Sequence, residues 1–294
     1  MAVAHGARDR LDVACVGDNC VDVSLERAGE ELAGGNAFNV AVELARAGLT
    51  TTYFGAVGTD ARAGLILDAA HAAGVDVAGI RRVPGATGVT VVARDDAGER
   101  SFVSQDYGVS AGYRLDKATA RGVSGHRWAH FARQPDLADW ASALRDAGTR
   151  LSCDLGVEME PGTLPRVGRY LDVAFFSTSA AGSVPADQLL REALACGVGL
   201  AVVTLGARGS VAARRERRWR APAVPVDEVI DTLGAGDAFI AAFVSVVLDD
   251  GDVDAALAAG AAAGAEACTR RGLANPLATE EAAAAPAMTE ETMP

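Results

Sequence analysis

Residues 39–58, NVAVELARAGLTTTYFGAVG, join a helical pattern to a β-rich run that begins just after Gly48. The same order recurs in residues 65–77, LILDAAHAAGVDV, and in residues 189–206, LLREALACGVGLAVVTLG, around Gly74 and Gly197. A glycine just past a helix end takes the left-handed conformation without a Cβ penalty. The three stretches therefore predict helices that stop at a glycine and lead into strands.

Apolar runs typical of buried strands occur between these helices, as in DVACVG at 12–17, RLSCDLG at 150–156 and LDVAFFS at 171–177. Helices that alternate with buried strands favour a mainly parallel sheet covered on both faces. We predict an α/β fold, a three-layer α/β/α sandwich, as a single domain over residues 11–272. Residues 1–10 and 275–294 are expected to be flexible or loosely docked ends, since the second is rich in Ala, Glu and Thr.

Two polar-alternating segments, about 22–34 and 87–104, have no helix beside them. They predict a small separate β-sheet that forms a lid, the second with a turn at Asp96–Gly98, although a plain surface hairpin fits the pattern equally well. Five arginines crowd into residues 214–220. Because the chain is acidic overall and only Trp219 interleaves them, we interpret this run as a solvated hairpin turn and not as a nucleic-acid site.

Composition narrows the function classes. The chain has 294 residues, 27 Lys and Arg against 39 Asp and Glu, and a net charge of −12, so its field attracts neither nucleic acid nor an anionic membrane. Its five cysteines are an odd number without a C-x-x-C pair, which indicates reduced thiols and a cytoplasmic protein. We expect no signal peptide and no membrane span. His126 and His130 lie in a predicted strand, so we expect no zinc site.

The stretch DTLGAGDAF, residues 231–239, precedes one of the most apolar helical patterns of the chain. Gly234, Ala235 and Gly236 leave backbone N–H groups exposed at a helix start, which is an anion-binding arrangement that needs no lysine. We expect the helix dipole to lower the pKa of Asp237. Phosphoryl transfer tolerates such a weak base, since the acceptor hydroxyl mainly needs alignment. The alternative is that Asp237 is simply a favourable residue for a first helical turn.

The residues DTLGAGD resemble the C-terminal signature of the ribokinase (phosphofructokinase-B) family of carbohydrate kinases, and GGNAFNVAVELARAG followed by FGAVGTD resembles its N-terminal signature. The resemblance covers Val13 to Gly272. It implies a ribokinase-like, ATP-dependent and magnesium-dependent kinase that phosphorylates a sugar hydroxyl, with a lid that often pairs with a second subunit as a homodimer. It leaves a monovalent cation open.

The resemblance also implies roles for individual residues. Asp237 matches the catalytic base, and Gly234, Ala235 and Gly236 match the anion hole. The matching sugar-binding positions are Asp22, Gly35, Asn36 and Asn39; helix N-capping is the alternative for the two asparagines. The matching nucleotide-side positions are Thr204, Gly206, Gly209, Asp231 and Thr232. Asp231 would organise cations near the phosphates, and Arg208 could reach phosphate, although solvent is its more common destination.

One stretch departs from the family pattern. After the strand at 171–177 the family usually carries an Asn and a Glu that place magnesium through water, whereas residues 177–183 here read STSAAGS. Either Mg²⁺ rests on the ATP phosphates with water and Asp231, with no direct side-chain ligand beyond that aspartate, or nucleotide handling differs from the family.

The stretches CVGDNCVDV, 15–23, and GGNAFNVAV, 34–42, resemble the fructoselysine 6-kinases of this family most. A fructosamine phosphorylated at carbon 6 is therefore the predicted substrate. Its positive charge needs a carboxylate partner, for which Asp106, Asp154, Glu158 and Glu160 are candidates. His130 could lie near the sugar, although a core position suits it better.

Three alternatives remain from the sequence. The chain could be another sugar or nucleoside kinase of the family, or a non-catalytic sugar-binding sensor on the same fold. A Rossmann oxidoreductase is disfavoured, because VGDNCVD follows the first strand where a dinucleotide site needs G-x-G-x-x-G.

Overall fold

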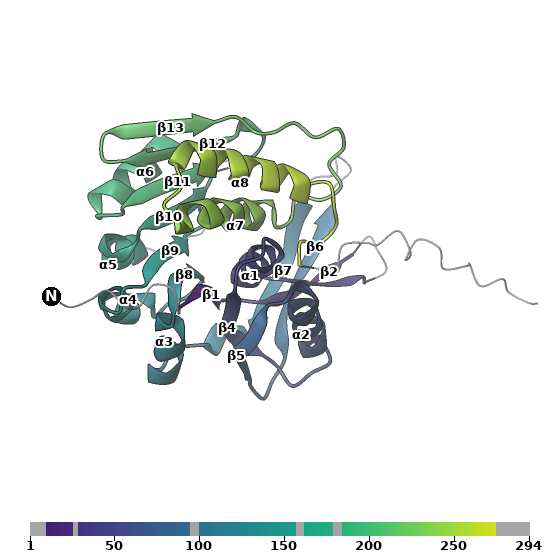
Figure 1. Ribbon diagram of the computed structural model, residues 1–294. Helices are drawn as coiled ribbons and strands as arrows, with labels where there is room; N and C mark the ends of the chain where they lie inside the picture. Colours follow the sequence, from purple (N-terminus) through teal and green to yellow (C-terminus); the bar gives the residue numbers. More distant parts are fainter. Residues whose placement is uncertain (1–9, 26–28, 95–99, 157–161, 179–183, 275–294) are drawn as a thin grey trace, which may run out of the picture.

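The computed structural model describes residues 10–25, 29–94, 100–156, 162–178 and 184–274. Within these residues the larger sheet has nine strands in the order β13-β12-β11-β10-β9-β8-β1-β4-β5 (Figure 1). Neighbouring strands are parallel except at β11–β12 and β12–β13. The strands are β1 (Leu11–Gly17), β4 (Thr51–Val57), β5 (Asp76–Arg82), β8 (His126–Ala132), β9 (Arg150–Asp154), β10 (Val173–Ser177), β11 (Leu200–Thr204), β12 (Ser210–Arg214) and β13 (Arg217–Ala221).

Helices cover both faces of this sheet (Figure 1). On one face lie α1 (Asn36–Arg46), α2 (Arg62–Ala73), α7 (Ala235–Leu248) and α8 (Val253–Ala267). On the other lie α3 (Lys117–Ser124), α4 (Leu137–Asp146), α5 (Thr163–Val167) and α6 (Ala186–Ala195). Along β1, Val13 and Cys15 join the first core while Ala14 and Val16 join the second. The predicted three-layer sandwich is therefore confirmed.

The predicted glycine stops are present as well. Gly48, Gly74 and Gly197 have φ values of 88°, 79° and 88°, the left-handed region that a side chain rarely adopts. The glycines thus end helices that lead directly into the sheet.

Short 3₁₀ turns, η1 (Val109–Gly112), η2 (Gly168–Tyr170) and η3 (Gly206–Arg208), follow β7, α5 and β11.

A second sheet of four strands lies beside the main domain, in the order β3-β2-β6-β7 (Figure 1). Its strands are β2 (Cys20–Ser24), β3 (Glu31–Gly34), β6 (Thr87–Arg94) and β7 (Arg100–Gly108). The predicted small second sheet is thus confirmed, while the single-domain boundaries at 11 and 272 stay a prediction. The predicted turn at Asp96–Gly98 and the tail from Asn275 lie outside the described residues.

The arginine-rich segment forms the antiparallel edge hairpin β12–β13. Arg215 occupies the turn with φ 53°, and Arg217 lies 4.6 Å from the centre of the ring of the buried Trp219. Arg217 and Arg218 also pair with Asp254 and Asp187 at 3.8 and 2.5 Å. These contacts agree with the interpretation of the run as a solvated turn. Among the described residues, no helix is long and apolar enough to cross a membrane.

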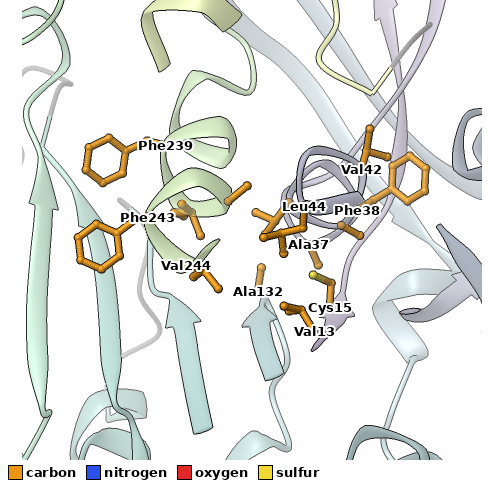
Figure 2. Close-up of a cluster of buried hydrophobic side chains, with 14 of the residues drawn as sticks. Val13, Cys15, Ala37, Phe38, Val42, Leu44, Ala132, Phe239, Phe243 and Val244 are labelled. Atoms are coloured by element: carbon orange, nitrogen blue, oxygen red, sulfur yellow. The ribbon is translucent and has the colours of Figure 1, made fainter. Parts of the chain in front are cut away.

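Helices α1 and α7 are held side by side by one apolar core (Figure 2). Figure 2 shows Phe38 and Leu44 of α1 in the same cluster as Phe243 and Val244 of α7. Phe243 is fully buried, and its ring lies edge-on 5.4 Å from that of Phe175 in β10. Burying each such side chain contributes about 1.5–3 kcal/mol. The core therefore fixes the relative position of the two helices and hence of their amino ends.

Candidate active site

Asp237 lies in the first turn of α7, next to amides that the protein leaves open. Gly234 precedes the helix with φ 80°. The N–H of Ala235 donates to the carbonyl of Thr232 at 3.3 Å. No hydrogen bond is present at the N–H groups of Gly234, Gly236 and Asp237 within the described chain. A Cβ added at Gly236 would meet no atom within 4 Å, so open space faces this residue. The proposed anion hole thus keeps its two glycines, whereas the amide of Ala235 is already used by the protein.

The Asp237 carboxylate is held by Asn39 of α1. Asn39 Nδ2 donates to Asp237 Oδ2 at 2.8 Å, and the two residues are 198 positions apart in the chain. Both side chains are buried, at 5% and 8% exposure. Asn39 Oδ1 is buried without a hydrogen-bond partner in the described chain, and the second oxygen of Asp237 is left for another donor. This pairing depends on the packing of α1 against α7.

The N-capping alternative for Asn36 and Asn39 does not describe this helix. The residue at the cap position of α1 is Gly35, and no side chain caps it. Asn36 Nδ2 instead donates to Asp154 Oδ2 at 3.4 Å. Both asparagines therefore face acids on other elements, one turn apart along the same helix.

The expected direction of the Asp237 pKa is wrong. Burial raises this pKa well above its ordinary value, and the nearby charges of Asp154, Asp18 and Asp22 add to the increase. The hydrogen bond from Asn39 opposes it only in part. The helix dipole that the sequence suggested is thus outweighed by desolvation in a pocket of like charges. Asp237 is a stronger base than an exposed aspartate.

The predicted sugar-side residues lie on the second sheet and at the start of α1, and the charge of Asp22 acts on Asp237. Asp22 lies on β2 and is 8% exposed, and a Cβ on Gly34 would come within 2.2 Å of its Oδ2. Gly35 has φ 110°, and a Cβ there would lie 2.4 Å from the Cα of Asn19. The β1–β2 connection of the chain itself therefore requires a glycine at position 35. The sequence had suggested a sugar-binding position here, but the close approach that requires the glycine is made by the protein backbone.

Asp18, in the β1–β2 connection, was missed by the sequence analysis. It is 7% exposed, and its carboxylate accepts from the N–H groups of Asn36 and Ala37, each at 3.4 Å. Its charge raises the pKa of Asp237 and of Asp154. The signal was present in GDN directly after the first strand, since a carboxylate at the carboxyl end of a central strand points toward the usual ligand crevice of such sheets.

The nucleotide-side residues lie at the ends of β11 and before α7. Thr204 Oγ1 donates to the carbonyl of Phe176 at 3.3 Å. Gly206 and Gly209 have φ values of 60° and 87°, and a Cβ on Gly209 would lie 2.1 Å from the Ala221 carbonyl oxygen, so the hairpin itself requires this glycine. Arg208, exposed as expected for solvent, donates to the carbonyl of Thr178 at 3.3 Å.

Asp231 is 1% exposed and accepts from the N–H of Leu233 at 2.8 Å and of Gly272 at 3.3 Å. Thr232, beside it, is exposed. A surface pocket of about 440 Å³ adjoins this segment, lined by Pro225, Val226, Asp227, Glu228, Ile230 and Thr269. Asp231 therefore helps to shape the turn before α7 next to an open pocket.

The remaining candidates from the sequence are His130, the acids expected near the substrate charge, and the stretch that departs from the family pattern. His130 is fully buried, with Nδ1 2.9 Å from Ser152 Oγ, and burial lowers its pKa to about 3, so it is a core residue. Asp106 accepts from the N–H of Gly108 on β7. Glu158, Glu160 and residues 179–183 of the departing stretch lie outside the described residues. Within the described ranges, no group of three His, Cys, Asp or Glu side chains could hold a metal ion.

Asp154 provides a pH-dependent test of this cluster. Burial raises its pKa from 3.8 to about 6, and the charge of Asp18 adds to the effect. Above pH 6 the carboxyl is ionised in both states, and the buried charge lowers the stability of the folded state. Below pH 4 the carboxyl is protonated in both states, and this penalty is absent. Asp154→Asn should therefore raise Tm at pH 8 by roughly 2–4 °C, the shift of about 1 kcal/mol in a chain of this size. At pH 5 the gain should be smaller.

Differential scanning calorimetry at the two pH values measures this difference. Asp146→Asn, an exposed change at the end of α4, should shift Tm equally little at both. A gain for Asp154→Asn that is the same at pH 5 and pH 8 would mean that its ionisation is not the cause.

Comparison with known proteins places this geometry in a family. Residues 11–280 match the family described as pfkB family carbohydrate kinase. The chain is 32% identical to fructosamine kinase FrlD of Bacillus subtilis over 261 residues, 88% of this chain and 91% of that protein. It is 32% identical to fructoselysine 6-kinase of Escherichia coli K12 over 236 residues, covering 79% and 87%. The structure of Arabidopsis thaliana ribokinase complexed with ribose and ATP superposes with a TM-score of 0.75 at 23% identity, covering 90% and 94% of the two chains.

Proposed function

Because the chain belongs to the pfkB family of carbohydrate kinases, we propose that it phosphorylates the carbon 6 hydroxyl of a fructosamine such as fructoselysine, with ATP as donor. The observation that carries the substrate class is the 32% identity, over most of both chains, to two relatives named as fructosamine and fructoselysine kinases. The acids beside Asp237 support it, since they suit a substrate with a positive charge.

In the proposed reaction, the acceptor hydroxyl lies against the free oxygen of Asp237. The hydroxyl oxygen forms a bond to the γ-phosphorus as the bond from that phosphorus to the β–γ bridging oxygen breaks, and ADP leaves. The hydroxyl proton passes to Asp237, whose other oxygen is held by Asn39. The N–H groups of Gly236 and Asp237 stabilise the phosphoryl oxygens. A raised pKa suits this role, because general base catalysis is most efficient when the pKa lies near the working pH.

The donor would approach from the side of Thr204, Gly206 and Gly209, with its phosphates at the amino end of α7 and its base toward the pocket that contains Ile230 and Thr269. The open space at Gly236 fits an anionic phosphate. Mg²⁺ usually keeps several waters and binds substrate phosphates. We therefore propose that Asp231 reaches the ion through water, and that Thr232 lies beside the phosphates.

We propose that the second sheet also joins two subunits. Its edge strand β7 exposes the neighbouring apolar side chains of Phe102 and Val103, at 66% and 56%, and an exposed apolar edge strand is a surface on which a second chain can pair. Light scattering on the purified chain measures the assembly directly, and a monomer at micromolar concentration would contradict the proposal. The unpaired cysteines fit a cytoplasmic location.

A substrate panel tests the proposed function. Fructoselysine, fructose, ribose, 2-keto-3-deoxygluconate and adenosine should be assayed with ATP by ADP release. We expect fructoselysine to have the highest kcat/KM. If fructoselysine is turned over no better than ribose, the chain is a kinase of this family with a different substrate. Binding of sugar without ADP release would favour the sensor alternative.

A further inference from the structure

Asp18 is a buried carboxylate whose charge the described protein does not neutralise. Only 7% of Asp18 is exposed, and its two hydrogen bonds, from the N–H groups of Asn36 and Ala37, are both long at 3.4 Å. It forms no ion pair with any residue of the described ranges; Arg133 acts on it only through a more distant charge. A buried charge without a close partner is costly, which indicates that something else pairs with it.

The surroundings of Asp18 add negative charge. Burial raises the pKa of Asp154 to about 6, and the nearby charge of Asp18 adds to the increase. Asn36 contacts both carboxylates, Asp18 through its N–H and Asp154 through its side-chain amide. Asp154 is the better satisfied of the two, since it also accepts from the N–H of Gly156 at 2.8 Å. The pair therefore offers one poorly satisfied carboxylate and one better satisfied carboxylate to the same space.

A second observation points to a ligand along α1. Only 5% of Asn39 is exposed, its side-chain N–H donates to Asp237, and its Oδ1 has no hydrogen-bond partner in the described chain. Asn36 and Asn39 are three residues apart, about 4.5 Å along a helix axis. A ketose lying along this first turn would bring one end hydroxyl to Asp237 and its opposite end toward Asp18 and Asp154.

We propose that Asp18 is a specificity residue that binds the protonated amine on carbon 1 of an amino-ketose, and that the nearby carboxylate of Asp154 stabilises the same positive charge. This inference rests on the proposed function and names the side chain that distinguishes a fructosamine from a neutral ketose. A substrate ammonium supplies the missing partner for the buried carboxylate, and charge-assisted hydrogen bonds are about twice as strong as neutral ones. Arg133 is exposed and forms no ion pair with either acid within the described ranges, although its charge opposes the increase in the pKa of both.

A purely structural role for Asp18 makes a different prediction. Gly35 provides no side-chain cap for α1, so Asp18 also satisfies the first N–H groups of that helix from a neighbouring loop. Asp18→Asn removes the charge and keeps one of the two oxygens, so it retains one of these two hydrogen bonds. If capping were its whole role, cationic and neutral substrates would be affected alike.

The experiment compares 1-amino-1-deoxyfructose with fructose, which differ by an ammonium in place of a hydroxyl on carbon 1. The measured quantity is the ratio of the two kcat/KM values. If fructose is not turned over, it is tested as an inhibitor of amine phosphorylation, and the ratio of its inhibition constant to the KM of the amine is used instead. Wild type should prefer the amine. Asp18→Asn should lower that preference roughly 10- to 100-fold, mainly through KM, as expected for a lost hydrogen bond to a charged group. Asp146→Asn, exposed on α4, should leave the ratio unchanged.

A substrate series on wild type gives an independent readout if Asp18→Asn does not fold. N-acetylation of 1-amino-1-deoxyfructose removes its charge and should raise KM strongly. Wild type that phosphorylates the amine while Asp18→Asn keeps the same ratio, or that accepts the acetylated sugar equally well, overturns the role of Asp18 alone. Wild type that phosphorylates fructoselysine but neither small ketose overturns this inference alone, and wild type that phosphorylates none of the three overturns the proposed function as well.

Discussion

Asp237→Asn is expected to lower kcat by about 10²- to 10⁴-fold, the usual contribution of a positioned general base, while the sugar still binds. The substitution keeps the size of the side chain and its contact with Asn39. It removes the oxygen that would take the proton of the acceptor hydroxyl. Steady-state kinetics with fructoselysine measure the loss, and equilibrium binding of the sugar shows whether the site survives.

The opposite end of α7 supplies the matched control. Asp250 follows that helix, is exposed, and has φ 59°, a conformation that Asn tolerates well. Asp250→Asn should leave kcat and KM unchanged. A kcat within about threefold of wild type for Asp237→Asn would contradict the proposed role of the acid.

The pH profile should show the same group. A base works in its ionised form, so kcat/KM falls as the pH drops through its pKa. Because burial raises the pKa of Asp237, this acid limb should lie nearer to neutrality than an exposed aspartate would give. The sequence alone suggested the reverse, since it shows the helix start and not the desolvation.

The fold was predictable because its signals are local. A helix that stops at Gly48 and leads into β4 is read from consecutive residues, and alternation along β1 follows from the period of a strand. The signature around Asp237 is equally local. Each of these features requires only neighbours in the chain.

The contacts that make the site were not predictable in this way. Asn39 meets Asp237 across 198 positions because an apolar core sets α1 against α7, and no short pattern encodes that pairing. Asp18 stayed unnoticed since its importance depends on how deeply it is buried. A glycine at 35 signals a tight approach, but the sequence cannot say that the approaching group is Asn19 of the same chain.

Gly236→Ala should separate the function of the glycine turn from its stability. A methyl group at this position meets no protein atom within 4 Å, and the residue lies in the first turn of a helix. The change should therefore leave the free energy of unfolding unchanged or raise it by about 0.4–1 kcal/mol, with Tm kept or slightly raised. The methyl group would occupy the space proposed for the phosphoryl oxygens. Loss of one such stabilising donor typically costs about 10²- to 10³-fold in kcat, and we expect a loss of that size.

Two other glycines show why Gly236 is the informative choice for this test. Gly234 has φ 80°, and a Cβ there would lie 2.7 Å from Leu273, so its substitution would disturb the fold itself. Gly64, in the first turn of α2, has the same open surroundings as Gly236 but lies on an element that carries none of the proposed site residues. Gly64→Ala should therefore give a similar Tm with wild-type kcat. If Gly236→Ala also kept wild-type kcat, the amino end of α7 could not be where the transferred phosphoryl group is held, and the donor would have to bind elsewhere on the sheet.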